Sequence, residues 1–242
     1  MAAGDNSAAP RISREELYGD IEKTAHLSWI FAVLVALSTA VAAIGILRGD
    51  TVIIIGAMVI APLLGPNVAL SLSTTLGDGK LARQAVRTAA AGFLLALLLA
   101  ALIGLFTTVD PLAPEVLART RVSLADIVLA LAAGGAAALS FTSGLLSALI
   151  GVMVAAALLP PLVTLGLLVG NGEWRAAYEA LLLLLTNVIC INLSGVVVVL
   201  AQGVRPRSWG EAEKARKASL RALAVWTGLL AVLAVLIFLS GR

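Results

Sequence analysis

The sequence contains a single cysteine, Cys190, and a single histidine, His26. One cysteine cannot form a disulfide within the chain, and the sequence shows no spacing typical of a metal site. The HExxH and G-x-S-x-G patterns of common hydrolases are missing, and GDGK at 77–80 lacks the first glycine and the hydroxyl residue of a phosphate loop. These absences predict a protein that is not an enzyme and uses no metal or other cofactor.

Charge is also scarce: Asp, Glu, Lys and Arg make up 13% of the 242 residues, whereas 60% are hydrophobic. Soluble domains usually carry about a quarter charged residues. The stretches 88–109 and 223–239 contain no charge, and each approaches or exceeds the roughly 20 residues that a membrane helix needs. The sequence therefore predicts an all-α, polytopic membrane protein whose first partner is the lipid bilayer.

About seven apolar segments can be distinguished, with polar residues between them. They lie at 25–47, 52–76, 88–109, 124–142, 145–170, 176–203 and 222–240. If all seven cross, the basic residues divide twelve to five in favour of the N-terminal side. If the second and fifth segments instead re-enter on one side, the division is eleven to six. Both arrangements predict a cytoplasmic N-terminus in the cell (inner) membrane, because basic loops favour the cytoplasm.

The second and fifth segments resemble each other. GAMVIAPLLGPNVALSL (56–72) aligns without a gap with GVMVAAALLPPLVTLGL (151–167), with ten of seventeen positions identical. The same offset of 95 residues produces further identities upstream. We interpret segments one to three and four to six as a duplicated unit. Three crossings per unit would give inverted repeats, whereas two crossings and a re-entrant hairpin would give parallel ones.

This interpretation divides the chain into six parts. They are a cytoplasmic tail or amphipathic helix at 1–24, repeat one at 25–109, a connecting loop at 110–122, repeat two at 123–203, a basic cytoplasmic loop at 204–221, and a C-terminal span at 222–242.

Each of the two aligned stretches contains prolines in mid-segment, where a membrane helix should be continuous. Proline has no N–H, so Pro62 and Pro66 deprive the carbonyls of Met58 and Pro62 of their usual helical donors. Pro160 and Pro161 likewise leave the carbonyls of Ala156 and Ala157 without their usual helical donors. Irregular backbone at membrane depth survives only where it is buried in protein or lines a wet cavity. Two broken helices in matched halves therefore predict a transport site between them. The predicted substrate-binding residues are Pro62, Gly65, Pro66, Asn67, Pro160, Pro161, Thr164 and Asn187.

Two polar residues also have a capping interpretation. Asn67 follows the first break and could either bind a solute or cap the restarted helix. Asp126 could be a buried proton carrier, but Ser123-x-x-Asp126 matches a capping box at a helix start, which we favour. In segment six, Asn187 shares one helix face with Thr186, Cys190 and Ser194. We interpret this face as a contact between helices in preference to the lining of a cavity. Asn192 lies off the face, and we expect it to pack against another helix as well.

Three stretches carry a resemblance to a known family. APLLGP (61–66), ALLPPL (157–162) and TNVICINL (186–193), in this order and spacing, resemble the prokaryotic hydrophobic family catalogued as domain of unknown function 389. The resemblance covers about residues 26–203. It implies a shared membrane fold with proline motifs, and it implies no substrate or activity.

These features together predict a membrane transport protein for a small polar or charged solute, bound between two proline-broken helices. A channel could use the same parts. A membrane scaffold or sensor that docks partners on its basic loop is the alternative from another class. The sign of the solute's charge stays open, because a broken helix offers both donors and acceptors. Small-residue faces, such as that around Gly134 and Gly135, predict close helix packing and a homo-oligomer, and no feature predicts nucleic-acid binding.

Overall fold

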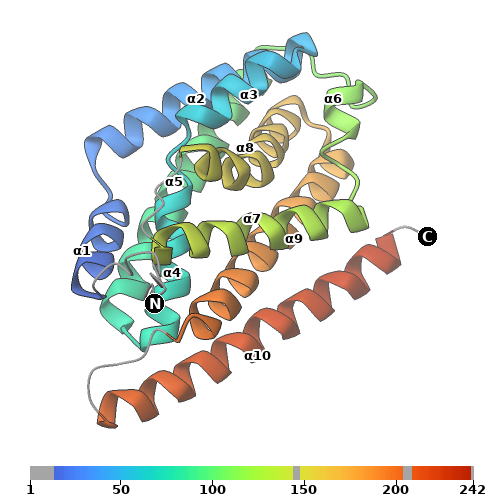
Figure 1. The fold of residues 1–242 in the computed structure, drawn as a ribbon. Coiled ribbons are helices and arrows are strands. Elements are labelled where there is room, and N and C mark those ends of the chain that lie inside the picture. Colours follow the sequence, from blue (N-terminus) through green and yellow to red (C-terminus); the bar gives the residue numbers. More distant parts are fainter. Residues whose placement is uncertain (1–13, 144–147, 204–208, 241–242) are drawn as a thin grey trace, which may run out of the picture.

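The computed structural model describes residues 14–143, 148–203 and 209–240, and the described chain is a bundle of helices (Figure 1). The helices are α1 (Arg14–Thr24), α2 (Trp29–Arg48), α3 (Thr51–Ile60), α4 (Leu64–Leu76), α5 (Gly79–Leu105), α6 (Pro114–Leu117), α7 (Leu124–Ser143), α8 (Ala148–Asn171), α9 (Trp174–Ala201) and α10 (Trp209–Ser240).

Six of these helices are long and apolar enough to cross a membrane, namely α2, α5, α7, α8, α9 and α10. The pair α3 and α4, bent by 53° at a short break, makes a seventh span if it is counted as one. The predicted polytopic, all-α membrane protein is confirmed. The predicted segments also correspond to helices in the predicted order.

The two ends of the described chain compare differently with the prediction. Residues 14–24 form helix α1, in agreement with the helical alternative for the N-terminal tail, although Ser13 of its predicted capping box lies outside the described residues. At the other end, α10 begins at Trp209 and not near residue 222, so most of the predicted basic loop at 204–221 is helical. After Gly210 the sequence up to Arg221 consists of good helix formers except for Ser219, and it continues directly into the apolar span without a breaking residue.

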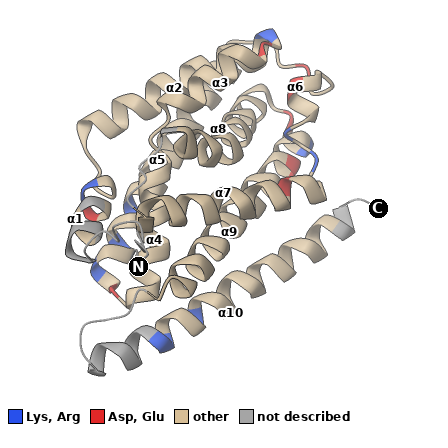
Figure 2. Ribbon diagram, in the orientation of Figure 1, with Lys and Arg blue, Asp and Glu red and all other residues tan. Residues whose placement is uncertain are grey.

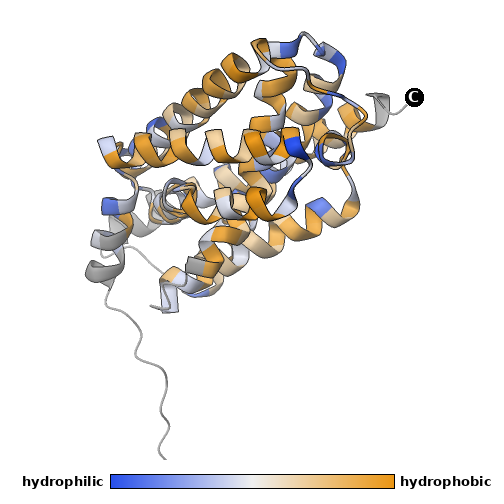
Figure 3. Cartoon of the chain, turned by 90° about the horizontal axis from the view of Figure 1, so that it is seen from above, coloured by the Kyte–Doolittle hydropathy of each residue, from blue (hydrophilic) through white to orange (hydrophobic). Residues whose placement is uncertain are grey.

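Charged side chains collect at two opposite ends of the bundle (Figure 2). One end carries α1, the turn between α4 and α5, and the described basic residues of α10 (Arg216, Lys217 and Arg221); we call it the α1 end. The other carries the α2–α3 turn, α6 and the start of α9; we call it the α6 end. Between these ends the helices are covered by apolar residues (Figure 3). This distribution is what a bilayer requires of a bundle whose helices run from one end to the other.

Helix α5 spans the bundle between these two ends. At its N-terminus, Asp78 Oδ1 accepts hydrogen bonds from the backbone N–H groups of Lys80 and Leu81 at 2.9 and 3.0 Å. At its C-terminus, Asn171 Nδ2 donates to the carbonyl of Thr107 at 2.8 Å. A helix of 27 residues is about 40 Å long. The turn after α4 and the turn after α8 therefore lie at opposite ends of the bundle.

The same contacts decide how the second and fifth segments run. Helix α3 starts at the α6 end, where Thr51 Oγ1 donates to Glu115 Oε1 at 2.8 Å. Helix α4 ends at the α1 end, where Tyr18 Oη donates to Asp78 Oδ2 at 2.6 Å. The α3–α4 pair thus passes from one end to the other, and α8 is a single helix that ends at Asn171, beside the C-terminal end of α5. In the described chain neither segment returns to the end at which it began.

Glycines bring the central helices into close contact, as the small-residue faces predict. A Cβ at Gly170 of α8 would overlap the backbone of Ala101 in α5, and a Cβ at Gly134 of α7 would overlap the backbone of Ile191 in α9. Both contacts lie within one chain. The small face of α7, one ground for predicting a homo-oligomer, is therefore occupied by α9.

Candidate functional site at the broken helix

The first predicted break is present. Helix α3 ends at Ile60 and α4 begins at Leu64, with Pro62 in the interval. The last regular bond of α3 runs from the N–H of Ala61 to the carbonyl of Ala57. Within the described chain, no hydrogen bond reaches the carbonyl oxygens of four residues at the break, Met58, Val59, Ala61 and Pro62. The reason is partly covalent, because Pro62 and Pro66 have no N–H to offer one turn later.

A chain of buried side-chain amides connects this break to α9. Asn67, which is 5% exposed, donates from Nδ2 to the carbonyl of Leu63 at 2.8 Å. Its Oδ1 accepts from Asn192 Nδ2 at 3.1 Å, and Asn192 Nδ2 also donates to the carbonyl of Val188 at 2.8 Å. The N-cap residue of α4 is Leu63, and no described side chain caps this helix, so the capping interpretation of Asn67 is wrong: its amide donates to a carbonyl one turn earlier and accepts from Asn192. Its amide also joins α4 to α9 across 125 residues of sequence.

Asn192 is the residue that sequence reasoning left out of the site. It lies off the polar face of α9, and that position suggested ordinary packing. The available signal was its chemistry, since a primary amide inside an apolar membrane helix needs a partner on another helix or in a cavity. The partner, Asn67, could not be identified from spacing because it belongs to the other repeat.

The second predicted break is absent, and this prediction is wrong. Helix α8 runs without interruption from Ala148 to Asn171, with Pro160 and Pro161 inside it. Pro161 cannot donate to the carbonyl of Ala157, and Asn187 Nδ2 of α9 donates to that carbonyl at 2.7 Å in its place. Helix α8 is also enclosed by its neighbours, and 78% of its apolar stretch is buried. Neighbouring helices can restore the bonds that proline removes, so the helix continues.

A cavity of about 450 Å³ lies against the break. Pro62, Leu64 and Gly65 line it from the break. The other lining residues come from the end of α1, the α1–α2 connection, α2 and the end of α7. They are Lys23, Thr24, His26, Ser28, Ile30, Phe31, Leu34 and Phe141. A Cβ at Gly65 would lie 2.6 Å from the carbonyl oxygen of Thr24, so only glycine allows this close approach at the start of α4.

The structure thus brings together only part of the predicted site. Pro62 and Gly65 line the cavity, and Pro66 and Asn67 are buried directly behind them. Asn187, Pro160 and Pro161 are not among the residues that line this cavity; Asn187 instead bonds to Ala157 of α8. Thr164 is 0% exposed and its hydroxyl oxygen has no hydrogen-bond partner among the described residues. It lies seven residues beyond Ala157 on α8, about 10 Å further along the helix, and so away from Asn187.

Asp126 is a cap, as predicted. Asp126 Oδ2 accepts from the backbone N–H and the hydroxyl of Ser123 at 2.9 and 2.6 Å. The N–H of Asp126 in turn donates to the hydroxyl of Ser123 at 3.3 Å. This is the reciprocal pairing of a capping box at the start of α7. The carboxylate therefore lies at the end of the bundle.

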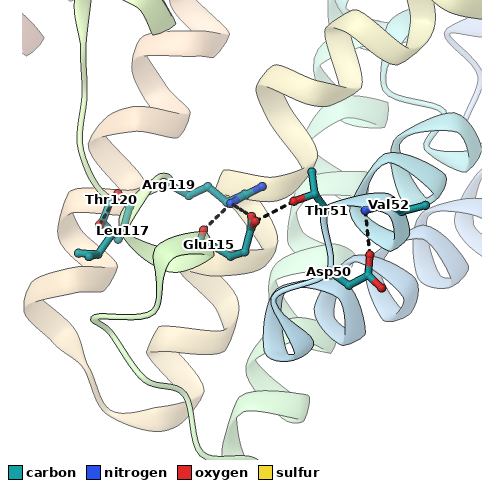
Figure 4. A network of polar contacts seen from close by, with 7 residues as sticks. All are labelled: Asp50, Thr51, Val52, Glu115, Leu117, Arg119 and Thr120. Carbon is teal, nitrogen blue, oxygen red and sulfur yellow. Dashed lines mark hydrogen bonds and ion pairs between the residues drawn. The ribbon is translucent and has the colours of Figure 1, made fainter.

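A polar network at the α6 end holds the α2–α3 turn against α6 (Figure 4). Glu115 accepts from the Thr51 hydroxyl at 2.8 Å and forms an ion pair with Arg119 at 2.6 Å. Partial burial alone would raise the pKa of Glu115, but the hydrogen bonds from Thr51 and Arg119 outweigh it and hold the pKa below its usual range. Asp50 caps α3 by accepting from the N–H of Val52 at 2.9 Å.

The comparisons with known proteins agree with this description. Residues 58–193 match the family described as "Domain of unknown function (DUF389)", which is more than half of the chain. The chain belongs to this family. The "Uncharacterized protein MJ0678" of Methanocaldococcus jannaschii is 41% identical over 227 residues, covering 94% of this chain and 71% of that protein. No solved structure matches. The resemblance inferred from the proline motifs is confirmed, and the DUF389 match runs from within α3 to within α9, so it includes the break and both amides of α9.

Proposed function

We propose that this DUF389 protein is a membrane transport protein that carries a small polar or charged solute past the α3–α4 break. One observation supports the proposal most directly: a span is interrupted in its middle, its carbonyls lack donors, and the interruption lies on a cavity. Exposing such carbonyls to lipid would cost several kcal/mol each. Irregular backbone of this kind is tolerated where it lines a wet cavity, and in transporters it often marks the substrate site.

The proposed site depends on one break and on the amide of Asn192. The two halves, α2–α5 and α7–α9, would still be related as inverted repeats. The positions of the two turns at opposite ends of α5 favour that relation, since three crossings turn the second unit over. Movement of one half against the other would expose the cavity alternately to each side. The predominance of basic residues at the α1 end favours a cytoplasmic location for that end in the cell membrane.

The test is tracer uptake by proteoliposomes that contain the purified protein. The tracers form a panel of small ions and solutes: sodium, rubidium, methylammonium, chloride and phosphate. The double variant Pro62→Ala/Pro66→Ala restores two backbone N–H groups and allows α3 and α4 to join. We expect uptake of at least one tracer, reduced about tenfold or more in this variant because the broken backbone is lost.

Gly56→Ala is the matched control, because it alters α3 at a position where a Cβ meets nothing within 4 Å. This control should transport like the wild type. Saturable uptake would favour a transporter, and uptake that never saturates would favour a channel. If the folded wild-type protein moves no tracer, or if the double variant transports normally, the proposed function is wrong. In the first case the scaffold or sensor becomes the better explanation.

A further inference from the structure

The buried amides of α9 use their donors and leave acceptors unpaired. Asn192 Nδ2 donates twice, to Asn67 Oδ1 and to the carbonyl of Val188. Its own Oδ1 is buried and has no hydrogen-bond partner in the described chain. Asn187, which donates to Ala157, leaves its Oδ1 in the same condition. A buried acceptor without a partner costs about 1–3 kcal/mol, so each oxygen favours a ligand that donates hydrogen bonds or carries positive charge.

The break adds oxygens of the same kind. No donor in the described chain reaches the carbonyls of Met58, Val59, Ala61 and Pro62, and these carbonyls lie at or just beyond the C-terminal end of α3, which is the negative end of the helix dipole. Two hydrogen bonds connect this region to Asn192, from Asn192 to Asn67 and from Asn67 to the carbonyl of Leu63. The break and the amide oxygen of Asn192 thus belong to one continuous polar region.

The start of α4 and the basic residues near it are poorly suited to hold an anion. The start of α4 would offer free N–H groups and a positive dipole end. Pro66 removes one of those N–H groups, and the carbonyl oxygen of Thr24 lies directly against Gly65. A partial negative charge therefore lies beside the start of α4 and disfavours an anion there. Lys23 and His26 line the cavity mouth, but both are exposed, where water and salt screen their charge.

From these contacts we propose that the break and Asn192 form a binding site for a monovalent cation such as Na⁺ or K⁺. The ligands would be neutral carbonyl and amide oxygens. Divalent cations usually require carboxylates, and the described residues contain no group of three or more His, Cys, Asp and Glu side chains that could hold a metal. Neutral carbonyls suit monovalent ions, and the C-terminal ends of half-helices hold such ions in other transporters. The inference rests on the proposed function: the cation would be either the transported solute or the ion whose movement is coupled to it.

The test measures thermal unfolding of the purified chain in chloride salts of sodium, potassium or N-methylglucamine, all at an ionic strength of about 0.15 M. A ligand that binds only the folded state stabilises it by RT ln(1 + L/Kd), where L is the ligand concentration, so the melting temperature rises with the logarithm of ligand concentration above the dissociation constant. We expect Na⁺ or K⁺ to raise the melting temperature by about 3 °C or more over N-methylglucamine, with this logarithmic dependence on concentration.

Variants assign the effect to the site. Asn192→Leu should abolish the cation-specific shift. Asn192→Asp should produce the same shift at an about tenfold lower cation concentration, because a carboxylate strengthens the ligand set. The control is Thr186→Val, in the same helix, where the hydroxyl donates only to the carbonyl of Leu182 at 2.8 Å; it should keep the shift.

Equal melting temperatures in the three salts would overturn the inference, whatever the variants do, and would mean that the unpaired oxygens bind water only. A shift that survives in Asn192→Leu would also overturn it. Selective stabilisation by phosphate or sulfate, in place of a cation, would do the same. Cation binding without any tracer flux would contradict the transport proposal and leave the site intact. Flux without cation-specific stabilisation would contradict the site alone.

Discussion

In α8, Asn187 gives the carbonyl of Ala157 the hydrogen bond that Pro161 cannot. The prolines of both repeats are plain in the sequence, and their local chemistry predicts a break in each. Whether the break forms depends on a donor supplied by another helix. Asn187 lies 30 residues from Ala157 in sequence, and no local pattern connects the two. At the scale of single residues, the sequence thus predicts where donors are missing, but tertiary contacts decide whether they are replaced.

This explanation predicts a specific double-mutant result. Asn187→Leu should destabilise the protein by about 1–3 kcal/mol, because the buried carbonyl of Ala157 loses its partner. Pro161→Ala restores a backbone N–H at the position that normally serves this carbonyl. Combining the two substitutions should therefore recover most of the loss, which a cycle of unfolding measurements in detergent would show as a coupling energy.

Thr186→Val, beside Asn187, serves as the control for a buried polar residue whose bond stays within α9. If the double variant is as unstable as Asn187→Leu alone, the bond to Ala157 is not what keeps α8 continuous.

At the scale of elements, α1 is attached to the rest of the bundle by hydrogen bonds near the α1 end. Tyr18 donates to Asp78 at 2.6 Å, and Thr88 of α5 donates to the carbonyl of Ala25 at 2.6 Å. Gln84 also donates to the carbonyl of Glu22, at 3.4 Å. The connection after α1 forms a wall of the cavity at the break. The sequence predicts α1 as one of two possibilities, but its docking depends on residues sixty positions away.

The Tyr18–Asp78 pair predicts how the stability of this attachment depends on pH. Burial above all, together with the hydrogen bond to Asp78 and the nearby negative charges, raises the pKa of Tyr18 to about 12. Burial alone would raise the pKa of Asp78, but the hydrogen bond from Tyr18 and the backbone N–H groups of Leu81 and Lys80 outweigh it and lower the pKa. The unfolded values are about 10 and about 4. The contribution is therefore fully present between them, is lost above pH 10 as Tyr18 ionises, and is lost below pH 4 as Asp78 is protonated.

Tyr18→Phe should cost about 1 kcal/mol near neutral pH, a modest loss because both groups are partly exposed. The difference in stability between the variant and the wild type should shrink towards both extremes of pH. Melting temperatures across the pH range measure this, and the ultraviolet absorbance of the phenolate follows the ionisation of Tyr18. A difference that stays constant from acid to alkaline pH would show that the pair does not titrate in this way.

At the scale of the whole molecule, hydropathy and the internal repeat predict the number and order of the spans. Charge counts leave two arrangements open, because turning the second and fifth segments back changes the balance of basic residues only slightly. Long-range contacts separate the arrangements: Tyr18 contacts Asp78 at the start of α5, and Asn171 contacts Thr107 just beyond its other end. Such contacts join residues far apart in the chain, so they are outside the reach of composition or periodicity.

Sidedness is accordingly the sharpest prediction for the molecule as a whole. In a Cys190→Ser background, a cysteine is placed at Gly79, where a Cβ meets nothing within 4 Å, or at Glu173, which is exposed at the start of α9. Position 173 is preferable to Gly172, whose φ of +83° would strain any other residue. Labelling of intact cells with a membrane-impermeant thiol reagent should modify position 173 and leave position 79 protected.

Permeabilised cells provide the control, since both cysteines should then react. Protection of one position in intact cells, with reaction of both after permeabilisation, means that the α3–α4 pair and α8 cross the membrane in opposite directions. That outcome gives inverted halves and places the break where alternating access can operate on it. Labelling of both positions in intact cells would put the two turns on one side, as only the re-entrant arrangement allows, and it would contradict both the path of α5 and the transport mechanism built on it.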